Sequence, residues 1–182
     1  DWLRFEDTDV IKFKIANTSI EVTNAGSFAT GSWFHFAAVR DSGDEITFYK
    51  NGYDLSATGC LGGTFVPERI GQKTSGATYF DGNIDELALF DTDLSAIEIK
   101  AIYDNKRLDL TKNSVGYESL SNLKAWWRMG DGDTYQVIAD RRKTFFTGSS
   151  FNFDGVDNFA IIEDHADFTV LDNSFSISGW VN

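Results

Sequence analysis

Cysteine and proline are almost absent from this chain of 182 residues, which has one of each, Cys60 and Pro67. A lone cysteine cannot form an intrachain disulfide, so the fold must be held together by its core. No stretch approaches about 18 consecutive apolar residues, and no basic region followed by an apolar one begins the chain. These absences argue against a disulfide-stapled scaffold and predict that the chain does not insert into a membrane.

Positive charge is also scarce, because 16 Lys and Arg face 28 Asp and Glu, which gives a formal net charge of −12. Phosphate backbones repel a chain of this sign, so nucleic acid is not an expected partner. Hydrophobic residues, in contrast, make up 42 % of the chain and aromatic residues 15 %. That proportion is ample for the core of one domain of this length.

Alternation of apolar and polar residues predicts a mostly β structure. Residues 10–15 alternate strictly, which predicts a half-buried strand with one wet face. Residues 33–39 are apolar on both faces, which predicts a strand covered on both sides. Asn51 and Gly52 lie between two further apolar runs. Since both tolerate a positive φ, they predict a tight hairpin.

One short helix is expected after these strands. Ser95 and Glu98 have the spacing of a capping box, in which each side chain satisfies a backbone amide at the start of a helix. Apolar residues follow, and the helix should end near Asn105.

Two groups of motifs carry a family resemblance. The first comprises Trp33-x-His35-x-Ala37-x-Val39, Tyr49-x-Asn51-Gly52 and Asp81-Gly82-x-Ile84-Asp85-Glu86; the second comprises Ala125-Trp126-Trp127-Arg128-Met129-Gly130-Asp131-Gly132-Asp133, Phe153-Asp154-Gly155 and Trp180-Val181. Together they resemble laminin G-like modules of the concanavalin A-like lectin/glucanase superfamily, including modules of phage and viral structural proteins. The fold implied is all-β, a jelly-roll sandwich of two antiparallel sheets with one short helix.

The resemblance also implies an order, in which the second group precedes the first. Residues 1–110 then form the closing half of a jelly roll, residues 111–122 a connector and residues 123–182 the opening half. The chain is either one permuted domain or the halves of two adjacent repeats. Family members have another strand or two between the segments that match the Trp180-Val181 strand and the strand of Trp2, Arg4 and Phe5. That stretch is short or missing here, so closure of the sheets at this corner is left open.

Catalysis is not expected. Glycoside hydrolases need two carboxylates across a cleft, and superfamily members of the laminarinase type carry Glu-x-Asp-x-x-Glu on one strand. The sequence has no such spacing, and His35 and His165 lack a nucleophile motif such as Gly-x-Ser-x-Gly. A glycoside hydrolase relative is therefore the weakest alternative.

A calcium site is expected from three aspartates. The resemblance implies Asp85 on the closing strand, with Asp131 and Asp133 after the Trp126-Trp127 strand as its partners. Calcium binds oxygen ligands gathered from loops in this way. Asp85 also lies between apolar residues, where a charge needs a partner. The alternative is that Asp85 caps a turn or accepts hydrogen bonds from backbone amides.

A ligand site is expected where aromatic and polar residues occur together. Trp2 with Arg4, and Tyr79 with Asp81, are the best candidates, because sugar sites pair an aromatic face with hydrogen-bonding groups. Other tryptophans are expected to fill the core between the sheets: Trp33, Trp180 and one of Trp126 and Trp127. The other of that adjacent pair must point to the opposite face, where it is either exposed or covered, by the helix or by a neighbouring subunit.

The function predicted is a non-catalytic recognition or adhesion module, extracellular or on a virion surface, that binds glycan or a protein surface with structural calcium. The alternative is a structural subunit of a viral or extracellular assembly, completed by neighbouring chains. A homo-oligomer or contact with neighbouring repeats is left open.

Overall fold

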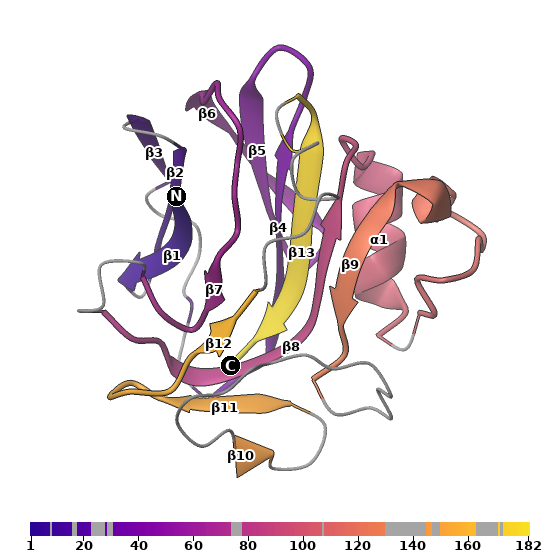
Figure 1. Cartoon of the computed structure of the whole chain (residues 1–182). Helices are drawn as coiled ribbons and strands as arrows, with labels where there is room; N and C mark the ends of the chain where they lie inside the picture. The colour runs from indigo at the N-terminus through magenta and orange to yellow at the C-terminus, as the bar shows by residue number, and fades with distance from the viewer. Residues whose placement is uncertain are drawn as a thin grey trace.

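Strands from both halves of the sequence share one large sheet (Figure 1). The computed structural model describes the chain except for residues 8, 16–17, 23–27, 29–30, 74–77, 107, 130–144, 147–149, 163–170 and 172. Within that part, the large antiparallel sheet has the order β10-β11-β8-β13-β4-β5-β6, and β9 pairs with β8. Its strands are β4 (Phe34–Arg40), β5 (Glu45–Lys50), β6 (Tyr53–Cys60), β8 (Asp81–Phe90), β9 (Leu123–Trp127), β10 (Phe145–Phe146), β11 (Phe151–Asp154) and β13 (Phe175–Val181).

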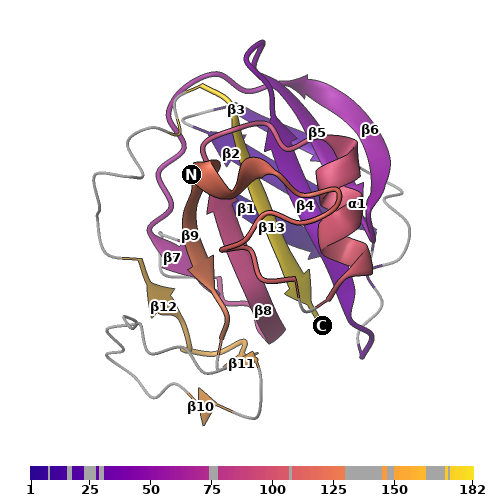
Figure 2. The ribbon, with the colours of Figure 1, turned by 90° about the vertical axis from the view of Figure 1, so that its right-hand side faces the viewer.

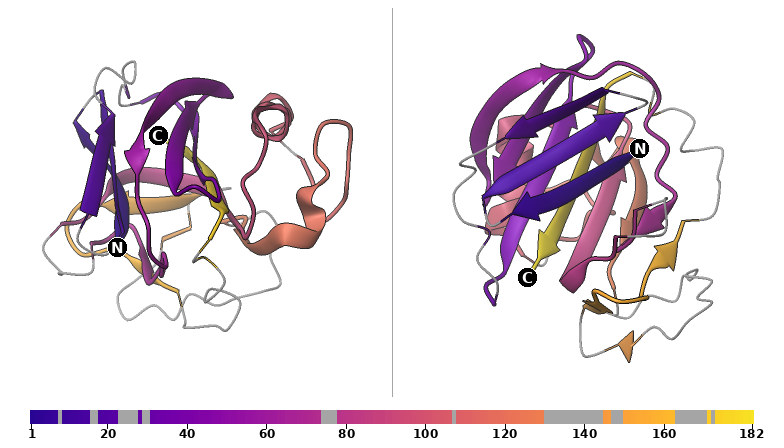
Figure 3. Two further views of the ribbon diagram at one scale, coloured as in Figure 1. Left: turned by 90° about the horizontal axis from the view of Figure 1, so that it is seen from above. Right: turned by 90° about the vertical axis from the view of Figure 1, so that its left-hand side faces the viewer.

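A smaller layer covers the inner face of this sheet. It consists of a three-stranded sheet, β1 (Trp2–Asp7), β2 (Val10–Ile15) and β3 (Thr18–Val22), and a two-stranded ribbon, β7 (Arg69–Ile70) and β12 (Ala160–Ile161). Figure 3 shows the three strands crossing in front of the large sheet, with β1 as the strand nearest to β7. The two layers confirm the all-β sandwich that the sequence predicts.

β13 lies in the middle of the large sheet. It pairs antiparallel with β4 along its whole length, from Phe175 opposite Arg40 to Val181 opposite Phe34. Its other edge pairs with β8, with a register shift between Ser178 and Trp180. The C-terminal segment of the chain therefore joins β4 and β8 into one sheet.

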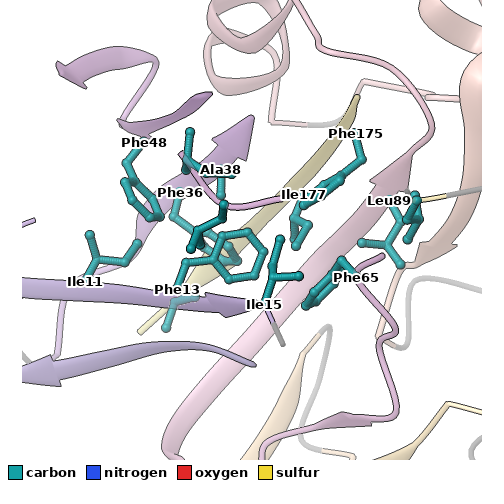
Figure 4. Packing of buried hydrophobic residues seen from close by; sticks show 14 of the residues in the cluster. Ile11, Phe13, Ile15, Phe36, Ala38, Phe48, Phe65, Leu89, Phe175 and Ile177 are labelled. Atoms are coloured by element: carbon teal, nitrogen blue, oxygen red, sulfur yellow. The ribbon is translucent and has the colours of Figure 1, made fainter. Parts of the chain in front are cut away.

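The main core lies between the large sheet and the three-stranded sheet (Figure 4). β2 contributes Ile11, Phe13 and Ile15, which are buried in strict alternation as predicted. The ring of Phe13 lies 5.1 Å from that of Phe65 and 5.9 Å from that of Phe175, both in edge-on contact. Aromatic pairs prefer this geometry to a face-to-face stack.

A second core lies on the outer face of the large sheet, beneath helix α1 (Ala96–Asp104) (Figure 2). Ile99 and Ile102 of α1 pack there against residues of β4 and β8. The Ser95–Glu98 capping box forms as predicted, and Asn105 caps the other end. After α1 the chain continues through the 3-10 helix η1 (Ser119–Asn122) to β9.

Two further local predictions are confirmed. Every residue of β4 is buried, because the three-stranded sheet covers one face and α1 the other. The turn between β5 and β6 has positive φ at Asn51 and Gly52, as a tight hairpin requires.

The tryptophan predictions are confirmed only in part. Trp126 packs on the helix side and Trp127 on the inner side, so the adjacent pair is divided as expected. The prediction for Trp33 is wrong. This residue lies just before the first residue of β4, and its side chain is 43 % exposed. The prediction for Trp180 is wrong in its layer. Ile177 and Val181 alternate inward, so Trp180 points outward and stacks on Tyr103 of α1.

Candidate functional site

A cavity of about 220 Å³ opens between β1 and the segment that carries β7. Its floor is the inner face of the large sheet, with side chains from β4, β8 and β13: Phe36, Ile84, Leu87, Leu89, Ile177 and Val181. Trp127 of β9 adds to the floor, Leu3 and Phe5 form the β1 wall, and Phe65 and Ile70 lie on the opposite wall. The interior is therefore apolar. It lies at the corner where the sequence left closure of the sheets open.

Three of the four predicted ligand-binding residues border this cavity. Trp2 and Arg4 come from β1, and Tyr79 comes from the chain just before β8. The chain around β7 lies alongside the start of β1: the amide of Val66 donates to a side-chain oxygen of Asp1 at 3.3 Å, and Lys73 lies over the Trp2 ring. Asp81 lies elsewhere: it is exposed and faces Asp154 across the β8–β11 pairing.

The rim of the cavity carries positive charge beside the Trp2 indole. The Arg4 guanidinium carbon lies 4.4 Å from the centroid of the Trp2 ring, and Lys73 Nζ lies 5.6 Å from it. Both distances are within cation–π range. The ring of Trp2 is therefore already engaged by cations, which leaves less of it for a sugar to stack on. Arg69 adds a third cation, and Asp1 and Glu68 add carboxylates to the same border.

Sequence reasoning missed Lys73 and the whole apolar floor. Lys73 follows the strand-like Arg69–Ile70 and has no motif of its own. Its amide donates to the carbonyl of Thr78, and Gln72 pairs with Tyr79, so a hairpin brings Lys73 and Tyr79 to the same rim. The floor residues looked like ordinary core positions, because alternation shows that a side chain is buried but not whether a second layer covers it.

The calcium prediction rests on residues of which only Asp85 is described. Asp85 is half-buried on β8, and its Oδ1 atom accepts a hydrogen bond from the amide of Glu86 at 2.9 Å. This is the backbone-amide role that the sequence offered as the alternative. Asp131 and Asp133 lie outside the described residues. Within the part that the structure describes, no three His, Cys, Asp or Glu side chains gather as a metal site.

Glu86, next to Asp85, holds a polar cluster that the sequence did not indicate. Its φ of 50° is unusual for a residue other than glycine. Trp126 Nε1 donates to Glu86 Oε2 at 2.5 Å, and Arg128 Nε lies 3.7 Å from Glu86 Oε1. The Arg128 guanidinium also lies over the Trp126 ring, 5.0 Å from its centroid. These contacts anchor the end of β9 to β8.

Comparison with known families identifies the superfamily that the sequence motifs resemble. A laminin G-like family model, described as the concanavalin A-like lectin/glucanases superfamily, matches residues 2–100, more than half of the chain. The chain belongs to this superfamily. The match spans β1 to the middle of α1, including the β1 and β7 walls of the cavity. No curated protein and no solved structure matches the chain. Among the described residues, no helix of this superfamily member is long and apolar enough to cross a membrane.

Proposed function

We propose that this chain is a non-catalytic recognition or adhesion module, extracellular or on a virion surface, whose ligand enters the cavity beside β1. One observation supports this most directly: Trp2, Arg4 and Tyr79, proposed from sequence as ligand-binding residues, border one apolar cavity. Concave apolar pockets with a few polar groups at the rim are the usual form of a binding site. A chain of the lectin/glucanase superfamily fits this role.

The chemistry of the floor supports binding without catalysis. The described side chains that β4, β8, β9 and β13 present to the cavity are all apolar, so this floor offers no carboxylate, hydroxyl or amine to act on a ligand, and the carboxylates of Asp1 and Glu68 lie on the border. Glycoside hydrolysis needs two carboxylates that flank the scissile bond.

Of the two ligand classes that the sequence left open, the cavity favours a protein surface over a glycan. A sugar presents hydroxyls, and an apolar floor leaves buried hydroxyls without hydrogen-bond partners. An apolar side chain has no hydrogen-bonding groups that such a floor would leave unsatisfied. The cations over the Trp2 ring point the same way, since they cover part of the face on which a sugar would stack.

The test is to measure binding by wild-type chain and by cavity variants on a glycan array and a peptide library. Trp2→Ala and Tyr79→Ala should weaken binding of any ligand found at least tenfold, which corresponds to about 1.4 kcal/mol. Tyr53→Ala is the matched control, because Tyr53 is an exposed aromatic residue beside α1, away from the cavity. Equal binding by all three variants would exclude the cavity as the site.

A further inference from the structure

β1 is an edge strand of the three-stranded sheet. Among the described residues, β1 pairs with β2 and with no other strand. An edge strand presents a row of backbone N–H and C=O groups that can accept a further strand. The cavity runs along this edge, with residues 1–5 on one side and residues 65–73 on the other.

The side chains of β1 alternate between the cavity and the outer surface. Phe5 points inward, because its ring lies 5.3 Å from that of Phe34 and 5.4 Å from that of Phe36. Leu3 packs against the same core. Trp2 and Arg4 alternate with these residues, so their side chains lie towards the outer face, at the rim of the cavity.

A strand placed beside β1 would have the same alternation. Every second side chain would enter the cavity and meet Leu3, Phe5, Ile84 and Val181. A cavity of about 150 Å³ with aliphatic and aromatic walls holds a benzene molecule. The 220 Å³ here therefore has room for apolar side chains of that size.

The other side chains of such a strand would lie on a basic surface. Arg4 is opposite Lys12 in the β1–β2 register, and Trp2 is opposite Lys14. Lys73 lies beside Trp2. These four cations outnumber the two carboxylates, Asp1 and Glu68, on the same border of a chain whose net charge is −12. Acidic side chains at the outward positions would complement them, since opposite charges on neighbouring strands of one face attract.

We propose that β1 accepts a fourth strand from a partner protein, an extended segment in which apolar and acidic residues alternate. The apolar side chains fill the cavity, and the acidic ones face Arg4, Lys73 and the lysines of β2. This inference rests on the proposed recognition function and names the ligand of the same site. Main-chain hydrogen bonds to the β1 edge provide affinity, and the alternation provides specificity.

The probe is a blocked eight-residue peptide of alternating valine and glutamate, titrated into the protein up to millimolar concentration by calorimetry. It should bind at least tenfold more tightly than the matched valine–lysine peptide. Lys73→Glu should reverse that preference. Lys112→Glu, at an exposed lysine paired with Asp109, is the control and should leave the preference unchanged.

N-methylation tests for the backbone pairing itself. Two methylated peptides are made, one with N-methyl groups on the odd-numbered residues and the other with N-methyl groups on the even-numbered residues. Each peptide lacks the hydrogen-bond donors of one edge of the strand. At least one of the two methylated peptides should bind at least tenfold more weakly than the parent. Equal binding by both, or no binding by the parent peptide, would overturn the strand inference.

The outcomes separate this inference from the function on which it rests. Oligosaccharide binding that is lost in Trp2→Ala, without any peptide binding, would overturn the added strand and leave the recognition function in place. Absence of any ligand on the array, the library and the probe peptide would contradict both.

Discussion

The Nε2 atom of His35 lies 2.8 Å from the Oγ atom of Ser178, and both side chains are fully buried. His35 belongs to β4 and Ser178 to β13, so this hydrogen bond joins two strands that are far apart in the sequence and adjacent in the sheet. The His35 ring also lies 5.3 Å from the Trp180 ring. Its Nδ1 atom has no hydrogen-bond partner among the described residues.

This environment predicts a pH-dependent stability. Burial lowers the pKa of His35 from 6.5 to about 3. Between these values an unfolded chain takes up a proton at His35 and the folded chain does not, so the free energy of unfolding falls as the pH falls from 6.5 towards 3. Urea titrations at pH 7 and pH 4.5 give the decrease in the free energy of unfolding between these two pH values. That decrease should be about 2–3 kcal/mol smaller for His35→Gln than for wild type. The same loss in both proteins would contradict a neutral buried imidazole.

Arg40 predicts a large loss of stability on substitution. Its guanidinium is fully buried and donates hydrogen bonds to the carbonyl oxygens of Asn173 at 2.6 Å, Leu61 at 3.0 Å and Gly63 at 2.5 Å. Arg40→Met removes all these donors and leaves the carbonyls unsatisfied, so urea unfolding should show a loss of about 3 kcal/mol or more. Exposed Lys112→Met is the control, with a change within about 0.5 kcal/mol. Similar values for the two variants would show that the carbonyls find other partners.

Local features of the sequence predicted local structure well. The Asn51-Gly52 turn and the Ser95–Glu98 capping box each depend on neighbouring residues, and both formed at the expected positions. The strict alternation of residues 10–15 likewise fixed the boundaries of β2. In these cases the physical cause lies within a few residues, so the sequence displays it.

Tertiary features could not be predicted in the same way. Alternation shows that Trp180 has a face opposite to that of Ile177, but not which face α1 covers, and so Trp180 was assigned to the wrong layer. The candidate site was predicted in part. Trp2, Arg4 and Tyr79 were predicted as ligand-binding residues, but the sequence does not show that they border one cavity. It also does not show that Lys73 lies on the same rim, because both facts depend on where the chain around β7 and Tyr79 lies relative to β1.

The expected calcium site remains a prediction. If Asp85 binds calcium together with Asp131 and Asp133, calcium should raise the melting temperature of the wild-type chain, and a chelator should reverse the rise. Asp85→Asn should abolish the response, while Asp104→Asn, at a residue of α1 paired with Lys100, should preserve it. A melting temperature unchanged by calcium and chelator would eliminate the site.

The solution mass tests the proposal that residues 1–110 and 123–182 form one permuted domain. Because β13 pairs with both β4 and β8 of the same chain, light scattering should give a monomer of about 20.3 kDa. Defined dimers or longer assemblies would instead show that neighbouring chains complete each half. The structural-subunit alternative would then replace the recognition module.

The central place of β13 also constrains how the protein is made. A ribosome releases β4, β5 and β8 well before residue 181 leaves the exit tunnel. During that interval β4 and β8 have no strand between them, and both edges are exposed to pairing with other nascent chains. Synthesis that stops before Phe175 does not yield a trimmed sandwich. It yields a large sheet without the strand that joins β4 to β8.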